Sequence, residues 1–78
     1  MPFGVPAAGI VETGCRADVW QPSSGKFYPH EWLPKGRKLT LLYMAAEQDG
    51  FTRGHVVALH PAYGDGRCFV FPFGALRQ

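Results

Sequence analysis

The chain has 78 residues, a net charge of +2, and 46% hydrophobic against 18% charged residues, a composition typical of one folded domain over residues 1–78. Its ten glycines and seven prolines interrupt it too often for long helices, which excludes a helical bundle, a coiled coil and a dinucleotide-binding domain. The charge excess is also smaller than that of most compact DNA-binding domains.

The first segment is apolar but rich in residues that break regular structure. Prolines and glycines follow one another closely within residues 1–9, which predicts an irregular N-terminal arm. No Lys or Arg precedes Arg16, and no apolar stretch approaches the roughly 20 residues of a membrane span. These features predict a cytoplasmic protein with neither a secretory signal nor membrane contact.

A strand signal comes next, followed by a long stretch without a regular pattern. Apolar and mostly polar residues alternate after Gly14, so residues 10–20 are predicted to form one bulged strand or two short ones. Residues 21–38 are expected to form one long irregular loop, because prolines interrupt the segment and a basic turn closes it. A loop of this length in a small domain is often functional.

The longest stretch without glycine or proline, residues 37–49, admits two interpretations. Several of its apolar residues have helical spacing, but further apolar residues lie between them. Asp49-Gly50 is typical of a tight hairpin turn, and a clear strand pattern follows over residues 51–60. We favour a strand–turn–strand unit and keep a helix at residues 38–48 as the alternative.

The last strand is predicted at residues 67–73, where Pro72 marks its end or a sheet edge. Four or five short strands joined by Gly/Pro turns predict a mainly β fold. We expect a small bent antiparallel sheet, or a barrel of the SH3-like or OB-like kind. Both faces of the last strand are apolar, which favours either closure into a barrel or a homodimer.

No set of residues has the spacing of a catalytic or metal site. Zinc sites need four ligands in close pairs, whereas His55 and His60 would point to opposite faces of a strand. The grouping of His60, Asp65 and Cys68 is typical of ordinary turn residues rather than of a nucleophile with its base. We expect no enzyme, no cofactor and no metal, and we leave open whether Cys15 and Cys68 form a disulfide.

The most distinctive chemistry is a group of basic and aromatic residues in and around the predicted loop. Three cations fall within residues 35–38, and aromatic residues precede them. This combination suits an acidic protein surface, and it equally suits phosphate contact with base stacking. The candidate partner-binding residues are Tyr28, Trp32, Lys35, Arg37, Lys38 and Arg53.

The C-terminal segment Val70-Phe-Pro-Phe-Gly-Ala-Leu-Arg77 resembles the end of the plasmid-type, trimethoprim-insensitive dihydrofolate reductases. Those are short SH3-like chains that assemble as tetramers around one pore, and their tail reads Val-Gln-Ile-Tyr-Pro-Val-Ala-Ala-Leu-Glu-Arg. The resemblance covers this tail alone and implies a barrel and an oligomeric reductase. The Gln and Tyr of that tail fall on Phe69 and Phe71 here, which cannot make their hydrogen bonds.

From its size and these residues, we expect a small non-enzymatic interaction protein that binds and inhibits a larger protein or ribonucleoprotein. Stand-alone inhibitors of this kind are encoded by phages and other mobile elements, and anti-CRISPR proteins are one such class. The first alternative is a small nucleic-acid-binding β-barrel that uses the same loop. The second is a reductase of the dihydrofolate reductase kind.

Overall fold

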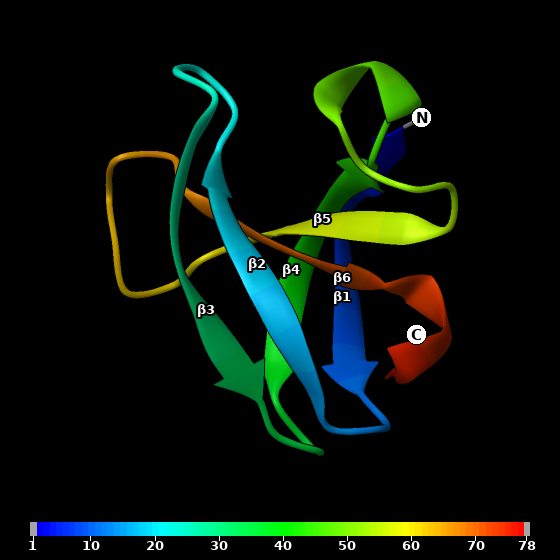
Figure 1. Cartoon of the computed structure of the whole chain (residues 1–78). Coiled ribbons are helices and arrows are strands. Elements are labelled where there is room, and N and C mark those ends of the chain that lie inside the picture. Colours follow the sequence, from blue (N-terminus) through cyan, green and yellow to red (C-terminus); the bar gives the residue numbers. More distant parts are fainter. Residues whose placement is uncertain (1, 78) are drawn as a thin grey trace.

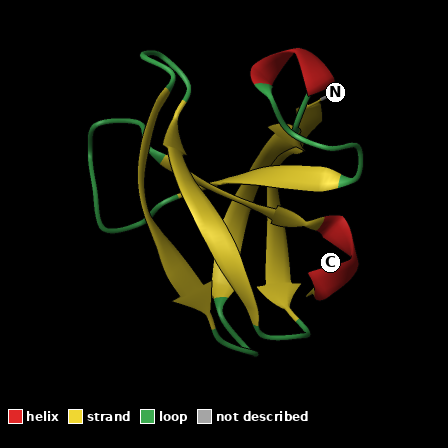
Figure 2. Ribbon diagram, in the orientation of Figure 1, coloured by secondary structure: helices red, strands yellow, loops and turns green. Residues whose placement is uncertain are grey.

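The computed structural model describes the backbone of residues 2–77 and the side chains of residues 7–77, which form one open antiparallel sheet (Figure 1). Seven strands lie in the order β3-β2-β6-β5-β4-β1-β7. Two 3-10 turns, η1 and η2, are the only helical elements of the described chain (Figure 2). The predicted mainly β fold is therefore confirmed. The elements are β1 (Pro2–Val11), β2 (Cys15–Gln21), β3 (Lys26–Leu33), β4 (Lys38–Met44), η1 (Glu47–Asp49), β5 (His55–Leu59), β6 (Cys68–Pro72), η2 (Phe73–Ala75) and β7 (Leu76–Arg77).

The ambiguous central segment is a strand. β4 pairs with β1 on one side and with β5 on the other, so the alternative of a helix at residues 38–48 is wrong. Burial alternates along its first half, where Leu39 and Leu41 enter the core and Lys38 and Thr40 stay exposed. Asp49-Gly50 does not form a two-residue hairpin, because η1 lies within the connection from β4 to β5.

The long loop predicted at residues 21–38 is wrong in its centre, where β3 pairs with β2 as a hairpin. Pro29 lies inside β3, and the sheet tolerates it because β3 is the edge strand and has a partner on one side only. The pairing shifts between Ala17 and Val19, opposite this proline. A proline-rich edge strand therefore has the sequence pattern of a loop.

The expected irregular arm at residues 1–9 is also wrong over residues 2–9, which belong to β1. Ile10 of β1 pairs with both β4 and β7, whereas the paired residues before it contact β4 alone. Prolines are tolerated where one side of a strand is unpaired. The sheet has seven strands rather than four or five, and β3 and β7 are the strands that the sequence pattern did not indicate.

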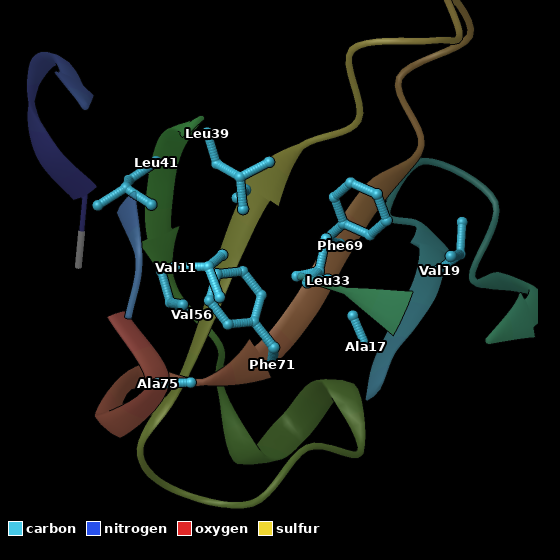
Figure 3. Packing of buried hydrophobic residues seen from close by; sticks show 11 residues of the cluster. Val11, Ala17, Val19, Leu33, Leu39, Leu41, Val56, Phe69, Phe71 and Ala75 are labelled. Carbon is cyan, nitrogen blue, oxygen red and sulfur yellow. The ribbon is translucent and has the colours of Figure 1, made fainter. Parts of the chain in front are cut away.

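The sheet curls so that its inner face encloses the main core (Figure 3). Phe69 and Phe71 of β6 lie in this inner cluster and are fully buried. Residues from both ends of the sheet order, such as Leu33 of β3 and Val11 of β1, meet there. The inner cluster consists of Val11, Ala17, Val19, Leu33, Leu39, Leu41, Val56, Ala58, Phe69, Phe71 and Ala75.

A second cluster covers the opposite face of β5 and β6. Trp20, Val57, Cys68 and Val70 are buried there, and Phe51 of the β4–β5 connection packs edge-on against Trp20 with ring centroids 5.0 Å apart. The chain thus covers both apolar faces of its central strands by itself. Because both faces are covered, the apolar faces of β6 no longer indicate a homodimer, and the oligomeric state stays a prediction.

Candidate binding surface

One end of the sheet gathers segments that are far apart in the sequence. The β3–β4 turn lies beside the end of β1, because the N–H of Val11 donates to the Arg37 carbonyl at 2.9 Å and the N–H of Gly36 donates to the Val11 carbonyl at 2.7 Å. The N–H of Glu12 donates to the carbonyl of Ala75 in η2 at 2.7 Å. We call this the basic end, comprising residues 10–16, 32–38 and 75–77 (Figure 1).

The basic end carries most of the positive charge of the chain. Five cations and one carboxylate, Glu12, give it a net charge of +4, while the three cations and five carboxylates elsewhere sum to −2. Among the described residues, none of the five cations lies within 4.0 Å of a carboxylate oxygen, whereas Arg53 and Arg67 do, beside Glu47 and Asp65. The five cations are Arg16, Lys35, Arg37, Lys38 and Arg77.

Trp32 is the large exposed hydrophobic residue of this end. Trp32 is 63% exposed, although it pairs in register with Arg16 of β2. A Cβ added at Gly14 would lie 2.8 Å from Cζ2 of Trp32, so the indole rests on the space that this glycine leaves. Trp32 is therefore supported from below while most of its surface faces solvent, an arrangement typical of an interface anchor.

A second group of side chains lies on the β4–β1–β7 part of the same end. Ile10 of β1 pairs with Lys38 on one side and with Arg77 on the other, so these three residues form one row across the sheet. The Cα atoms of the two cations are about 10 Å apart, since neighbouring strands lie about 4.8 Å apart. Half-buried Ile10 thus sits between two exposed positive charges.

The remaining two cations differ in their availability. Lys35 is exposed in the β3–β4 turn, next to Gly36, whose φ of +92° is a conformation that favours glycine. Arg37 is half-buried, and its guanidinium carbon lies 5.8 Å from the ring centroid of Phe69. Lys35 can therefore contact a partner directly, whereas Arg37 is partly used within the fold.

The structure separates two of the predicted contact residues from the rest. Arg53 lies in the β4–β5 connection, at the upper right of Figure 1, whereas the β3–β4 turn lies at the bottom. Tyr28 faces the inner side of β3 and packs between Lys26 and Arg67, with Nζ 4.8 Å and the guanidinium carbon 3.7 Å from its ring centroid. Trp32, Lys35, Arg37 and Lys38 are thus brought together, and Arg53 and Tyr28 are not.

Arg16 and Arg77 were not predicted as contact residues from the sequence. Neither lies near the basic turn in sequence, and each reaches it only through strand pairing, Arg16 beside Trp32 and Arg77 beside Ile10. The alternation in residues 15–20 did indicate that Arg16 faces away from the core. Only the order of the strands in the sheet shows that both residues lie at the basic end.

Arg67 forms a clamp over the inner side of β3. Its guanidinium carbon lies 3.7 Å from the ring centroids of both Tyr28 and Tyr63. Its Nε and Nη2 donate to the carboxylate of Asp65, the shortest of these contacts being 2.7 Å. These hydrogen bonds lower the pKa of Asp65 and raise that of Arg67. The clamp fastens the β5–β6 loop to β3.

Beneath this clamp lies His60, whose side chain is buried. Its Nε2 lies 3.0 Å from Oε2 of Glu31, and its Nδ1 accepts a hydrogen bond from the N–H of Ala62 at 3.1 Å. Because Nδ1 accepts, Nε2 donates to the carboxylate. Its ring also stacks on Phe69, with centroids 4.2 Å apart. Both ring nitrogens and one ring face of His60 are thus used inside the fold.

The two cysteines are free thiols, which settles the open question of a disulfide. Cys68 belongs to the cluster opposite the face on which His60 stacks, so His60, Asp65 and Cys68 do not form one site. Burial raises the pKa of both the Cys15 and the Cys68 thiol, which disfavours the reactive thiolate.

Within residues 2–77 there is no pocket, no group of three or more residues that could hold a metal ion, and no helix long and apolar enough to cross a membrane. No family model, no curated protein and no solved structure matches the chain. Phe69 and Phe71, which stand at the polar positions of the dihydrofolate reductase tail, are fully buried in the inner cluster. Neither side chain reaches the surface.

Proposed function

We propose that this chain is a non-enzymatic interaction protein that binds a larger acidic protein through its basic end. The observation that carries the proposal is the supported, exposed indole of Trp32 together with five cations that have no carboxylate partner within the described chain. Exposed aromatic residues beside basic ones are typical anchors of protein interfaces.

The size of the molecule supports one interface that covers this whole end. The Cα atoms extend over 29 × 24 × 22 Å. The area of one end is therefore no larger than that of a standard interface, which buries about 800 Å² per partner. We propose that one partner contacts both Trp32 and the Lys38–Ile10–Arg77 row. Occupying that surface on the partner would prevent its use by other molecules, so we include inhibition in the proposal.

Both cysteines are free thiols, which is typical of proteins in a reducing compartment. We therefore propose that the chain binds its partner in the cytoplasm. The second candidate function is nucleic-acid binding, which the net charge of +4 at the basic end favours. Both candidates use the same cations, so the experiment has to separate surface residues first and partner class afterwards.

The test compares two double variants that change the charge equally. Arg16→Glu with Lys35→Glu alters the basic end, and Lys26→Glu with Arg53→Glu alters exposed cations away from it. Each is immobilised and used to capture proteins from a nuclease-treated bacterial lysate, and captured proteins are quantified against the wild-type chain. We expect the amount of one captured protein to fall about tenfold for the basic-end variant, as when anchor residues are removed from an interface. The control variant should capture as much of that protein as the wild-type chain.

An equal loss from both variants would mean that overall charge, and not this surface, drives capture. Equal retention by both variants would show that the basic end is not the contact surface. Circular dichroism of all three proteins establishes that the comparison is made between folded chains.

A further inference from the structure

Glu12 is the one carboxylate at the basic end, and the fold holds it there. The N–H groups of Glu12 and Thr13 both donate to the Ala75 carbonyl, at 2.7 and 3.2 Å. On the other side, the hydrogen bonds between Val11 and the β3–β4 turn fix the residue that precedes it. Glu12 therefore lies between the turn that carries Lys35 and the strand that carries Arg77.

The carboxylate of Glu12 is exposed and unneutralised. Among the described residues no Lys, Arg or His nitrogen lies within 4.0 Å of it, although five cations share this end. A ligand that covers the end must therefore meet four excess positive charges with a negative charge among them. This is a mixed pattern and not a uniformly positive one.

The mixed pattern discriminates between two classes of macromolecule. Nucleic acids present phosphates and have no cationic group to place opposite a carboxylate. A phosphate brought to about 4 Å from the carboxylate is repelled even in water, which weakens binding by about fivefold. A protein can place a Lys or Arg at that point within an otherwise acidic surface. Such like-charge contacts are a usual means of excluding wrong partners.

We propose that Glu12 determines the class of partner: it disfavours nucleic acid, and the protein partner places a basic residue opposite it. This inference rests on the proposed function of the basic end. Ligands made only of negative groups then bind weakly, while an acidic protein surface that contains one cation binds well.

The test measures DNA binding by anisotropy, with fluorescent oligothymidylate and a short duplex as the probes. The variants are Glu12→Gln and Glu12→Lys, and Asp49→Lys is the matched control because it makes the same charge change in η1, outside the basic end. We expect Glu12→Lys to raise DNA affinity roughly tenfold at about 50 mM salt, with a smaller gain for Glu12→Gln, and the salt slope to steepen by about one.

The control should change DNA affinity by less than about twofold, because charges further apart than about 10 Å are screened at moderate salt. An equal gain from Asp49→Lys, or no gain from Glu12→Lys, would overturn the inference. In either case the proposed function stands if the Arg16→Glu/Lys35→Glu variant still loses its captured protein.

The same variants also test the positive half of the inference. Glu12→Lys places like charges at the protein interface, so it should lose the captured protein while Asp49→Lys retains it. Retention by Glu12→Lys would show that no basic residue of the partner faces Glu12. Tight, salt-sensitive DNA binding by the wild-type chain that the Arg16→Glu/Lys35→Glu variant loses would contradict both proposals and establish nucleic acid as the ligand.

Discussion

Gly14 makes room for the indole of Trp32 because glycine has no side chain. The indole occupies the volume where a Cβ would stand, 2.8 Å from Cζ2. The backbone of Gly14 is not in the left-handed region, so a larger residue meets no conformational barrier there. The requirement for glycine at this position therefore comes from the indole above it.

We predict that Gly14→Ala tilts the Trp32 ring and weakens partner capture by about three- to tenfold while unfolding is little affected. The contact is with the far end of one exposed side chain, so the cost in stability should be below about 1 kcal/mol. The indole N–H signal of Trp32 in NMR spectra reports the tilt, and chemical unfolding reports stability. An unmoved indole signal with unchanged capture would show that Gly14 does not position this anchor.

At this scale the sequence indicated part of the surface. Interleaved aromatic and basic residues were enough to select Trp32, Lys35 and Lys38 as contact residues. Glu12 and the two further arginines were not selected, because single charges on separate strands have no local pattern. Glu12 and Arg77 reach this end through hydrogen bonds of β1 with η2, β7 and the β3–β4 turn, and Arg16 reaches it through the pairing of β2 with β3. No sequence spacing expresses these contacts.

Among the elements, β3 shows how proline misleads a sequence-based prediction. Pro29 and the loop-like composition of residues 21–38 suggested irregular structure, yet β3 has eight residues and pairs with β2. An edge strand needs hydrogen bonds on one side only, so it accepts a proline that a central strand would reject. The same proline and the adjacent pairing irregularity discourage addition of another strand at that edge. This favours contact through side chains, as at Trp32.

The β5–β6 loop is fastened to β3 by Arg67, and this contact depends on the ionised form of Asp65. The hydrogen bonds from Arg67 hold the pKa of Asp65 below its ordinary value of about 3.9 in the folded chain. A group with a lowered folded-state pKa adds stability above the unfolded pKa and loses it as the pH falls through the folded one.

We therefore predict that Asp65→Asn is less stable than the wild-type chain at neutral pH, and that the difference shrinks as the pH falls below about 4. Urea unfolding over a pH series measures both curves. Arg67→Ala should show the same pH dependence with a constant loss of stability added to it, because it also removes the contacts with Tyr28 and Tyr63. Parallel curves that stay apart at the lowest pH would show that the pair does not contribute through ionisation.

For the whole molecule, the mainly β class followed from alternation and from the spacing of glycines and prolines. The seven-stranded order did not, since it depends on which strands meet across long sequence separations, such as Val11 and Leu33 in the inner cluster. The self-coverage of both faces was missed for a similar reason. Phe51 was assigned to a strand, whereas it lies in the connection that covers β5 and β6.

The separation of charge between the ends is a property of the whole fold. A net charge of +4 at one end and −2 elsewhere gives the molecule an electric dipole. Such a distribution steers an acidic partner toward the basic end and accelerates association at low salt. It also means that variants at the basic end should change the association rate as well as the lifetime of the complex.

The most direct measurement of the central claim is hydrogen–deuterium exchange of the chain, free and bound to its purified captured protein. We predict slower exchange at residues 12–16, 32–38 and 76–77 in the complex, with no change in the β4–β5 connection at residues 45–54. Protection confined to residues 45–54, with none at the basic end, would contradict the proposed surface.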